Sequence, residues 1–161
     1  MNDTRLFEFE SDFVESLRCI PMAVRFKLDR CGIKLSLRQW SRLTLDDRRD
    51  LRARPCDNDE EVATYRGAVV DLVQLRADEP AKALTTQPCG VWDDCRQAAP
   101  VVVNYARTLD LRPPSDAAWA RLTQLERFVL VKLTRDNHDN INFAPAMREF
   151  GLEADFEAVG I

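Results

Sequence analysis

The feature that most constrains this chain is an internal match between two of its segments. When the sequence is shifted by 79 residues, residues 21–58 align without a gap on residues 100–137, and eleven of the 38 pairs are identical. Unrelated sequences would share about two at ordinary residue frequencies. The identical residues of the first segment are Pro21, Val24, Ser36, Trp40, Arg42, Leu43, Thr44, Arg48, Leu51, Asp57 and Asn58. These are helix starters, caps and large anchors, so we expect two diverged copies of one helical unit, over about residues 20–58 and 99–137.

Helix-capping signals recur at the same place in both copies. Thr44 with Asp47, and Thr123 with Glu126, fit the capping box, in which each of two side chains bonds the other residue's backbone N–H at the start of a helix. The residues around these boxes predict a helix, a loop, a short helix with a tryptophan and a capped helix in each copy. Because two copies rarely suffice for an open array, we expect a closed bundle.

Between the copies, the sequence predicts one long helix followed by a long connection. Asp57 with Glu60 repeats the capping signal, and an apolar stripe of helical period follows over about residues 59–77. Residues 78–99 show no period and contain two prolines and a glycine, which is typical of a connecting loop. The whole chain has only five glycines, fewer than strands with tight turns usually need. The expected fold class is therefore all-α, a single-domain helical bundle in which both copies share a core.

The two copies differ most in the helix that follows the capping box. The second copy reads LERFVLVKL there and the first reads DDRRDLRAR, so one helix should be buried and the other should face water. Trp40 and Trp119, at equivalent positions, should be buried in both copies. The exposed helix offers Arg48, Arg49 and Arg52 as candidate partner-binding residues, because a guanidinium group pairs with carboxylates and its stem covers apolar surface. Arg48 has an alternative role, stacking on the Trp40 ring.

Charge and hydropathy argue against several classes of partner. The formal net charge is −4, whereas a polyanion binder needs clustered excess positive charge. The arginine-rich segment 45–54 resembles the reading helix of a helix-turn-helix protein, but three aspartates on it cancel most of its charge. A nucleic-acid-binding regulator is therefore kept only as an alternative. No stretch approaches the ~18 apolar residues of a membrane span, and the N-terminus lacks the pattern of a secretory signal, so no membrane partner is expected.

The five cysteines indicate ordinary thiols. Without a secretory signal, an odd number is typical of reduced cysteines, and we expect a cytoplasmic protein. Zinc sites usually use closely spaced ligand pairs, and the nearest pair here, Cys89 and Cys95, encloses five residues. We therefore predict no metal site and no cofactor. Cys56 lies beside a helix start, where the helix dipole could lower the pKa of a thiol.

A polar segment near the C-terminus holds the single histidine. His138 lies in the run DNHDNINF, together with Asn137 and Asn140, and such polar runs are what turns and helix caps require. An adjacent acidic residue would also let the histidine do acid–base work. A small redox or hydrolytic enzyme that uses Cys56 or His138 is thus a second alternative.

Several segments together resemble one known family. They are FEFESDFVESLRCIPMAVRFKLDRCGIKLSLRQW, RPCDN, LERFVLVKLTR and NINFAPAMREFGL. They are similar to the nitrate reductase-associated proteins, a family known chiefly from cyanobacteria, and the similarity covers nearly the whole chain. The genes of such proteins often stand beside those for nitrate reductase and for molybdopterin synthesis. The resemblance brings no catalytic residues with it.

From the resemblance we expect a non-catalytic accessory protein of nitrate assimilation. Its role would be the assembly of a molybdenum enzyme or the loading of its molybdenum cofactor. The expected partner is nitrate reductase or a molybdenum-cofactor protein, bound through Arg48, Arg49 and Arg52.

Overall fold

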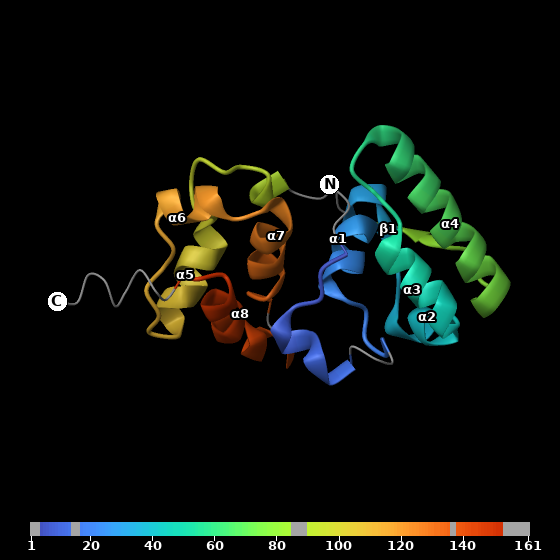
Figure 1. The fold of residues 1–161 in the computed structure, drawn as a ribbon, viewed down its shortest axis with the longest axis horizontal. Helices are drawn as coiled ribbons and strands as arrows, with labels where there is room; N and C mark the ends of the chain where they lie inside the picture. The colour runs from blue at the N-terminus through green and yellow to red at the C-terminus, as the bar shows by residue number, and fades with distance from the viewer. Residues whose placement is uncertain (1–3, 14–16, 85–89, 136–137, 153–161) are drawn as a thin grey trace. The chain divides into compact units, whose positions relative to one another are not determined.

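The computed structural model confirms the all-α fold class, because helices carry nearly all the regular structure (Figure 1). The structure describes residues 4–13, 17–84, 90–135 and 138–152. Contacts divide the chain into two compact units, residues 1–88 and residues 89–161. The single domain with a shared core, expected from the sequence, stays a prediction.

The first unit is built around the long helix α4. Its elements are η1 (Glu8–Phe13), α1 (Met22–Cys31), β1 (Ile33–Lys34), α2 (Leu37–Arg42), α3 (Leu45–Ala53), α4 (Asp59–Ala77) and β2 (Lys82–Ala83). Helices α1, α2 and α3 all contact α4. Tyr65, Val69 and Val73 of α4 are buried in this core together with Trp40 of α2. The apolar stripe predicted for the connecting helix therefore faces its neighbours.

Caps set where these helices begin and end. Thr44 and Asp47 form both hydrogen bonds of the predicted capping box at the start of α3. The cap of α4 is Asn58, whose side chain accepts from the backbone N–H of Glu61 at 2.9 Å. The sequence placed this cap at Asp57, one residue too early, because Asp and Asn both suit the position. At the end of α1, Gly32 takes the left-handed conformation (φ 72°) that closes a helix and favours glycine.

The predicted loop over residues 78–99 contains regular structure after all. Its residues Lys82–Ala83 form β2, which pairs antiparallel with β1, so that Ile33 lies opposite Ala83 and Lys34 opposite Lys82. A hydrogen bond from the N–H of Leu84 to the carbonyl of Gly32 extends the pairing. A two-residue strand has no detectable period, so only its partner reveals it.

The second unit packs its helices around α7. Its elements are η2 (Gly90–Trp92), α5 (Pro100–Thr108), α6 (Asp116–Arg121), α7 (Gln124–Lys132), η3 (His138–Asn142) and α8 (Phe143–Glu149). Helix α7 contacts η2, α5 and α8. Phe128, Val129 and Leu130 of α7 are fully buried, as the sequence predicted. Trp92 packs edge-on against Phe128, with ring centroids 5.1 Å apart.

Corresponding elements of the two units lie 79 residues apart. Helices α2 and α3 fall on α6 and α7 under that shift, and Trp40 and Trp119 are both 0% exposed. Each indole N–H donates to a backbone carbonyl that precedes the unit's first long helix, that of Leu17 at 2.6 Å and that of Asp94 at 2.9 Å. The burial of both tryptophans is confirmed, while the superposition of the two copies stays a prediction.

None of the helices among the described residues combines the length and the apolar character that a membrane crossing requires.

Candidate functional site

The three candidate arginines of α3 have different surroundings, and Arg48 is directed inward. Its Nε donates to the carbonyl of Trp40 at 3.2 Å, and its Nη2 donates to the carbonyl of Ser41 at 3.1 Å. Its guanidinium carbon also lies 5.8 Å from the centroid of the Trp40 ring. Arg48 therefore stabilises the end of α2, which is the alternative role that the sequence suggested for it.

Arg52 is also engaged within the first unit. Its Nη1 donates to the carbonyl of Thr4 at 2.9 Å and so ties the N-terminal segment to α3. Its Nε is buried and has no hydrogen-bond partner among the described residues. This side chain is half-buried, and a change at Arg52 would disturb the fold as well as any surface.

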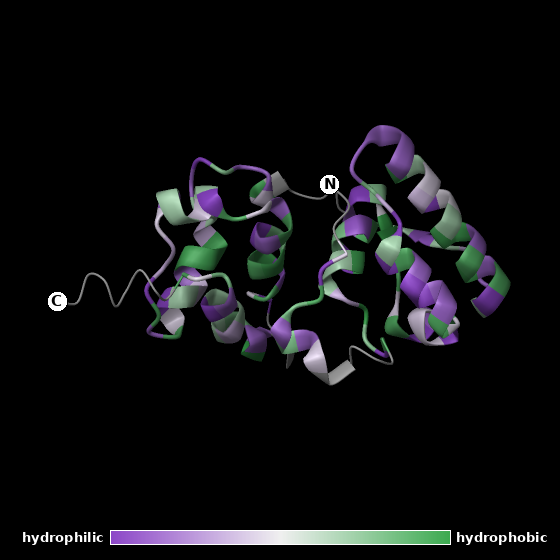
Figure 2. Cartoon of the chain, viewed as in Figure 1, coloured by the Kyte–Doolittle hydropathy of each residue, from purple (hydrophilic) through white to green (hydrophobic). Residues whose placement is uncertain are grey.

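Arg49 is the candidate arginine that faces water. Its side chain is 58% exposed, and its Nη1 lies 3.8 Å from a carboxylate oxygen of Asp46, one turn earlier. The exposed residues of α3 follow a helical period and form what we call the exposed stripe: Leu45, Asp46, Arg49, Asp50 and Ala53. Figure 2 accordingly colours most of α3 as hydrophilic, whereas hydrophobic bands cross α7.

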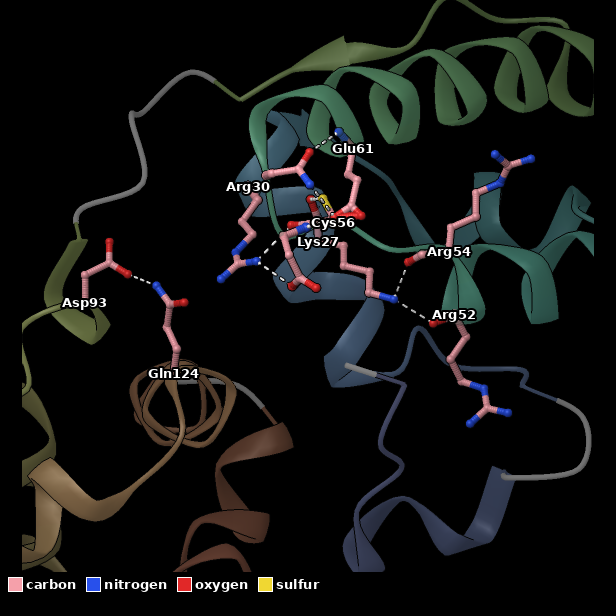
Figure 3. Close-up of polar contacts among 10 residues, drawn as sticks. Lys27, Arg30, Arg52, Arg54, Cys56, Glu61, Asp93 and Gln124 are labelled. Carbon is pink, nitrogen blue, oxygen red and sulfur yellow. Dashed lines mark hydrogen bonds and ion pairs between the residues drawn. The ribbon is translucent and has the colours of Figure 1, made fainter. Parts of the chain in front are cut away.

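Buried polar side chains form hydrogen bonds to the backbone carbonyls at the C-terminal end of α3. The Nζ of Lys27, a residue of α1 that is 2% exposed, donates to the carbonyls of Arg52 and Arg54 at 2.6 Å each (Figure 3). The hydroxyl of Tyr65 donates to the carbonyl of Leu51 at 2.8 Å. A cation at the last carbonyls of a helix is favoured because these groups carry the negative end of the helix dipole. The end of α3 is thus fixed to both α1 and α4.

The link between α3 and α4 is held in the same way. Arg30 of α1 donates to the carbonyl of Cys56 at 2.8 Å and pairs with the carboxylate of Asp57 at 3.3 Å (Figure 3). In the second unit, Gln124 at the start of α7 donates to the carboxylate of Asp93 (Figure 3).

Asp47 joins the N-terminal end of α3 to α4. Its carboxylate accepts from the N–H of Thr44 at 2.9 Å and from Nε of Arg76 at 2.8 Å. Partial burial acts to raise the pKa of Asp47, but the bonds from Arg76 and Thr44 outweigh it and hold this pKa below its ordinary value of 3.8. The carboxylate is therefore charged at neutral pH, and both ends of α3 are anchored.

The surroundings of Cys56 argue against the alternative of an enzyme that uses this cysteine. Cys56 is 1% exposed, and burial raises the pKa of its thiol to about 11, although Arg30 and Lys27 act in the opposite direction. Burial likewise raises the pKa of the Cys31 thiol to about 12. The sequence suggested that the nearby helix start could lower the pKa of Cys56. That suggestion was wrong, because desolvation of the thiolate outweighs the charges around it.

The polar segment around His138 forms a short 3-10 helix rather than an open loop. His138 begins η3, Asn140 lies within it half-buried, and Asn137 lies outside the described residues. Among the described residues, no three His, Cys, Asp or Glu side chains gather as a metal site would require. Cys89 lies outside the described part of the chain, so the predicted absence of a metal site stays a prediction.

A polar pocket that the sequence did not indicate lies beside the two-strand ladder. It has a volume of about 490 Å³ and is lined by Lys34, Ser36, Arg38, Gln39, Glu79, Pro80 and Lys82. These residues come from β1, from the cap and first turn of α2, from the segment that leads into β2, and from β2 itself. Lys34 and Lys82 are 48 positions apart in the sequence, and only the pairing of the strands brings them together. No sequence signal marked them, since each is a single lysine among apolar neighbours.

Comparison with known proteins identifies the family. Residues 6–150 match the family described as conserved nitrate reductase-associated protein. No curated protein and no solved structure matches the chain. The matched range includes α3, its anchors and every residue that lines the pocket. The chain therefore belongs to the nitrate reductase-associated protein family.

Proposed function

We propose that this chain is a non-catalytic accessory protein of nitrate assimilation that docks on a protein partner through the exposed stripe of α3. Family membership over residues 6–150 is the observation that carries the proposal. By that membership the favoured partner is nitrate reductase or a protein that handles its molybdenum cofactor. The role would be assembly of the enzyme or loading of the cofactor.

The anchoring of α3 supports this choice of surface. A docking surface gains affinity when its backbone is already fixed, because less conformational entropy is lost on binding. Helix α3 is capped at Thr44, tied to α4 through Asp47 and held at its last turn by Lys27.

The surroundings of the three candidate arginines favour one of them as the docking residue. Arg48 and Arg52 bond backbone carbonyls inside the unit, so we assign them to positioning the helix. Arg49 lies in the middle of the stripe and is the arginine we expect to contact the partner. Its guanidinium group can exchange the carboxylate of Asp46 for one on the partner, since a 3.8 Å surface pair is weak.

The test compares charge reversals at two exposed arginines, each of which pairs with a nearby aspartate. Arg49→Glu should weaken binding to purified nitrate reductase, or to the molybdenum-cofactor protein, by about tenfold, because a favourable charge becomes repulsive. Arg96→Glu is the control, since Arg96 is 87% exposed and also pairs with a neighbouring aspartate, Asp94, but belongs to the second unit. Both variants should keep the wild-type circular dichroism spectrum.

Affinity capture from nitrate-grown cells, read by mass spectrometry, gives the second readout. The wild type and Arg96→Glu should retain the same partner, and Arg49→Glu should lose most of it. If Arg49→Glu retains every wild-type partner, the docking surface lies elsewhere. If neither candidate enzyme is captured by the wild type, the proposed function itself is wrong.

A further inference from the structure

We propose that the pocket beside the β1–β2 ladder binds a small, multiply charged oxyanion, held between the side chains of Lys34 and Lys82. This inference does not depend on the proposed function. It rests on the charges that line the pocket, on the register of the ladder and on the polar character of the remaining lining residues.

The lining carries uncompensated positive charge. Arg38 donates to one carboxylate oxygen of Glu79, and Nε2 of Gln39 donates to the other at 3.0 Å. The negative charge of Glu79 is therefore balanced by Arg38. The ammonium groups of Lys34 and Lys82 have no ion-pair or hydrogen-bond partner among the residues that the structure describes. Two free positive charges therefore face one pocket, in a chain whose formal net charge is −4.

The register of the ladder sets these two charges side by side. Lys34 lies directly opposite Lys82 in the antiparallel pair. Directly opposed side chains have Cβ atoms about 5 Å apart, and like charges at such positions destabilise the pairing. The ladder is only two residues long, and Ile33 fixes its register by its burial at 2% exposure. An oxyanion between the two ammonium groups would turn this repulsion into two charge-assisted hydrogen bonds.

The rest of the lining suits a polar ligand. Gln39 is buried, and its Oε1 accepts from the N–H of Ser36, so this wall of the pocket is rigid. The Ser36 hydroxyl accepts from the N–H of Gln39 and keeps its own proton to donate. Pro80 is the apolar residue of the lining. A volume of about 490 Å³ lies within the range of small-molecule sites.

These features define the ligand class. Two lysines and a hydroxyl supply donors and positive charge, so the ligand needs at least two anionic oxygens. A phosphate-type anion and a small dicarboxylate share that chemistry. Duplex nucleic acid is disfavoured, because its affinity comes from neutralising many phosphates, and two free lysines neutralise few.

The experiment titrates the whole chain with inorganic pyrophosphate, inorganic phosphate and succinate at low ionic strength, where exposed charges are least screened. Binding is read by calorimetry and by the thermal midpoint of unfolding. We expect pyrophosphate to bind and to raise the midpoint. A shift by both pyrophosphate and succinate supports a general dianion site, and a shift by pyrophosphate or phosphate alone supports a phosphate-type ligand. No binding by any of the three probes overturns the inference.

Charge reversal at Lys82 separates binding from folding. Lys82→Glu places opposite charges across the ladder, so the variant without ligand should unfold at the wild-type temperature or above it. Its affinity for the anion should nevertheless fall at least about tenfold, because a charge-assisted bond becomes a repulsion. Arg49→Glu is the control, with the same change in net charge on the same unit but outside the pocket. If both variants lose the same affinity, the anion responds to overall charge and the assigned site is wrong.

Discussion

Helices α3 and α7 share their beginnings and differ in their surroundings. Both have nine residues, start at a threonine capping box and bury a leucine completely, Leu51 in α3 and Leu130 in α7. Yet Arg49, 58% exposed, corresponds to Phe128, which is 0% exposed. Caps fix where a helix starts, whereas the residues between the shared anchors decide whether neighbours cover it.

The arginine that the two helices share has a similar task in each. Arg48 bonds the carbonyls of Trp40 and Ser41, at the end of α2. Arg127 bonds the carbonyl of Leu122, at the end of α6, at 2.6 Å and that of Trp92 at 2.7 Å. Both arginines thus hold the turn between a tryptophan helix and the helix that follows it. The identity of Arg48 and Arg127 therefore marks a structural brace, whereas the exposed Arg49 has no arginine counterpart in α7.

We expect the largest difference in stability between the two helices when the residues at their one exposed and one buried equivalent position are exchanged. Phe128→Arg puts a charge into the core of the second unit and removes a fully buried ring, so it should cost about 3–5 kcal/mol of unfolding free energy or prevent folding of that unit. Arg49→Phe, the reverse change in α3, should stay within about 0.5 kcal/mol, as at most exposed sites. Denaturant unfolding followed by circular dichroism measures both. Similar losses in the two variants would contradict the contrast in burial.

Removing the shared caps should show what the helices have in common. Thr44→Ala and Thr123→Ala each delete the side-chain acceptor of one capping box, which typically costs about 1 kcal/mol. We expect losses of similar size in the same unfolding assay, with serine at either site restoring most of the stability. A loss confined to one variant would mean that the two boxes are not equivalent.

A smaller effect is expected from pH, which should change the stability that the bonds of Asp47 give to α3. The pKa of Asp47 is lowered in the folded chain, so its bonds stabilise fully above the ordinary value of 3.8, and this contribution disappears as the pH falls through the lower, folded-state pKa. NMR titration of the Asp47 carboxyl carbon should give a pKa below 3.8. Arg76→Gln should raise that pKa, because it removes the charged donor from α4. An unchanged pKa in the variant would assign the shift to Thr44 alone.

Much of the fold could be predicted because its signals are local. The capping box at Thr44 and the helical period around Val69 each lie within a few residues, and both gave correct elements. The cap of α4 was misplaced from Asn58 to Asp57, since neighbouring residues of similar capping strength compete. Helix bounds depend on such short-range chemistry, so errors of one residue are the expected kind.

The candidate site could be predicted only in part, because its contacts are long-range. The sequence marked Arg48, Arg49 and Arg52 as one face, but the carbonyls of Trp40 and Thr4 that engage two of them are set by packing. Lys27 carried no signal, because a lone lysine is ordinarily a surface residue. The opposition of Lys34 and Lys82 depends on a two-residue ladder that no periodicity can reveal.

The buried ammonium group of Lys27 offers a way to measure how often the first unit opens. Acylating reagents need an exposed, neutral amine, and Lys34 and Lys82 lie on the surface, whereas the Nζ of Lys27 is enclosed and bonded to two carbonyls. Lys27 can therefore be acylated only when α1 separates from the end of α3. The rate at which Lys27 is labelled, set against that of the surface lysines, reports how often the unit opens under native conditions.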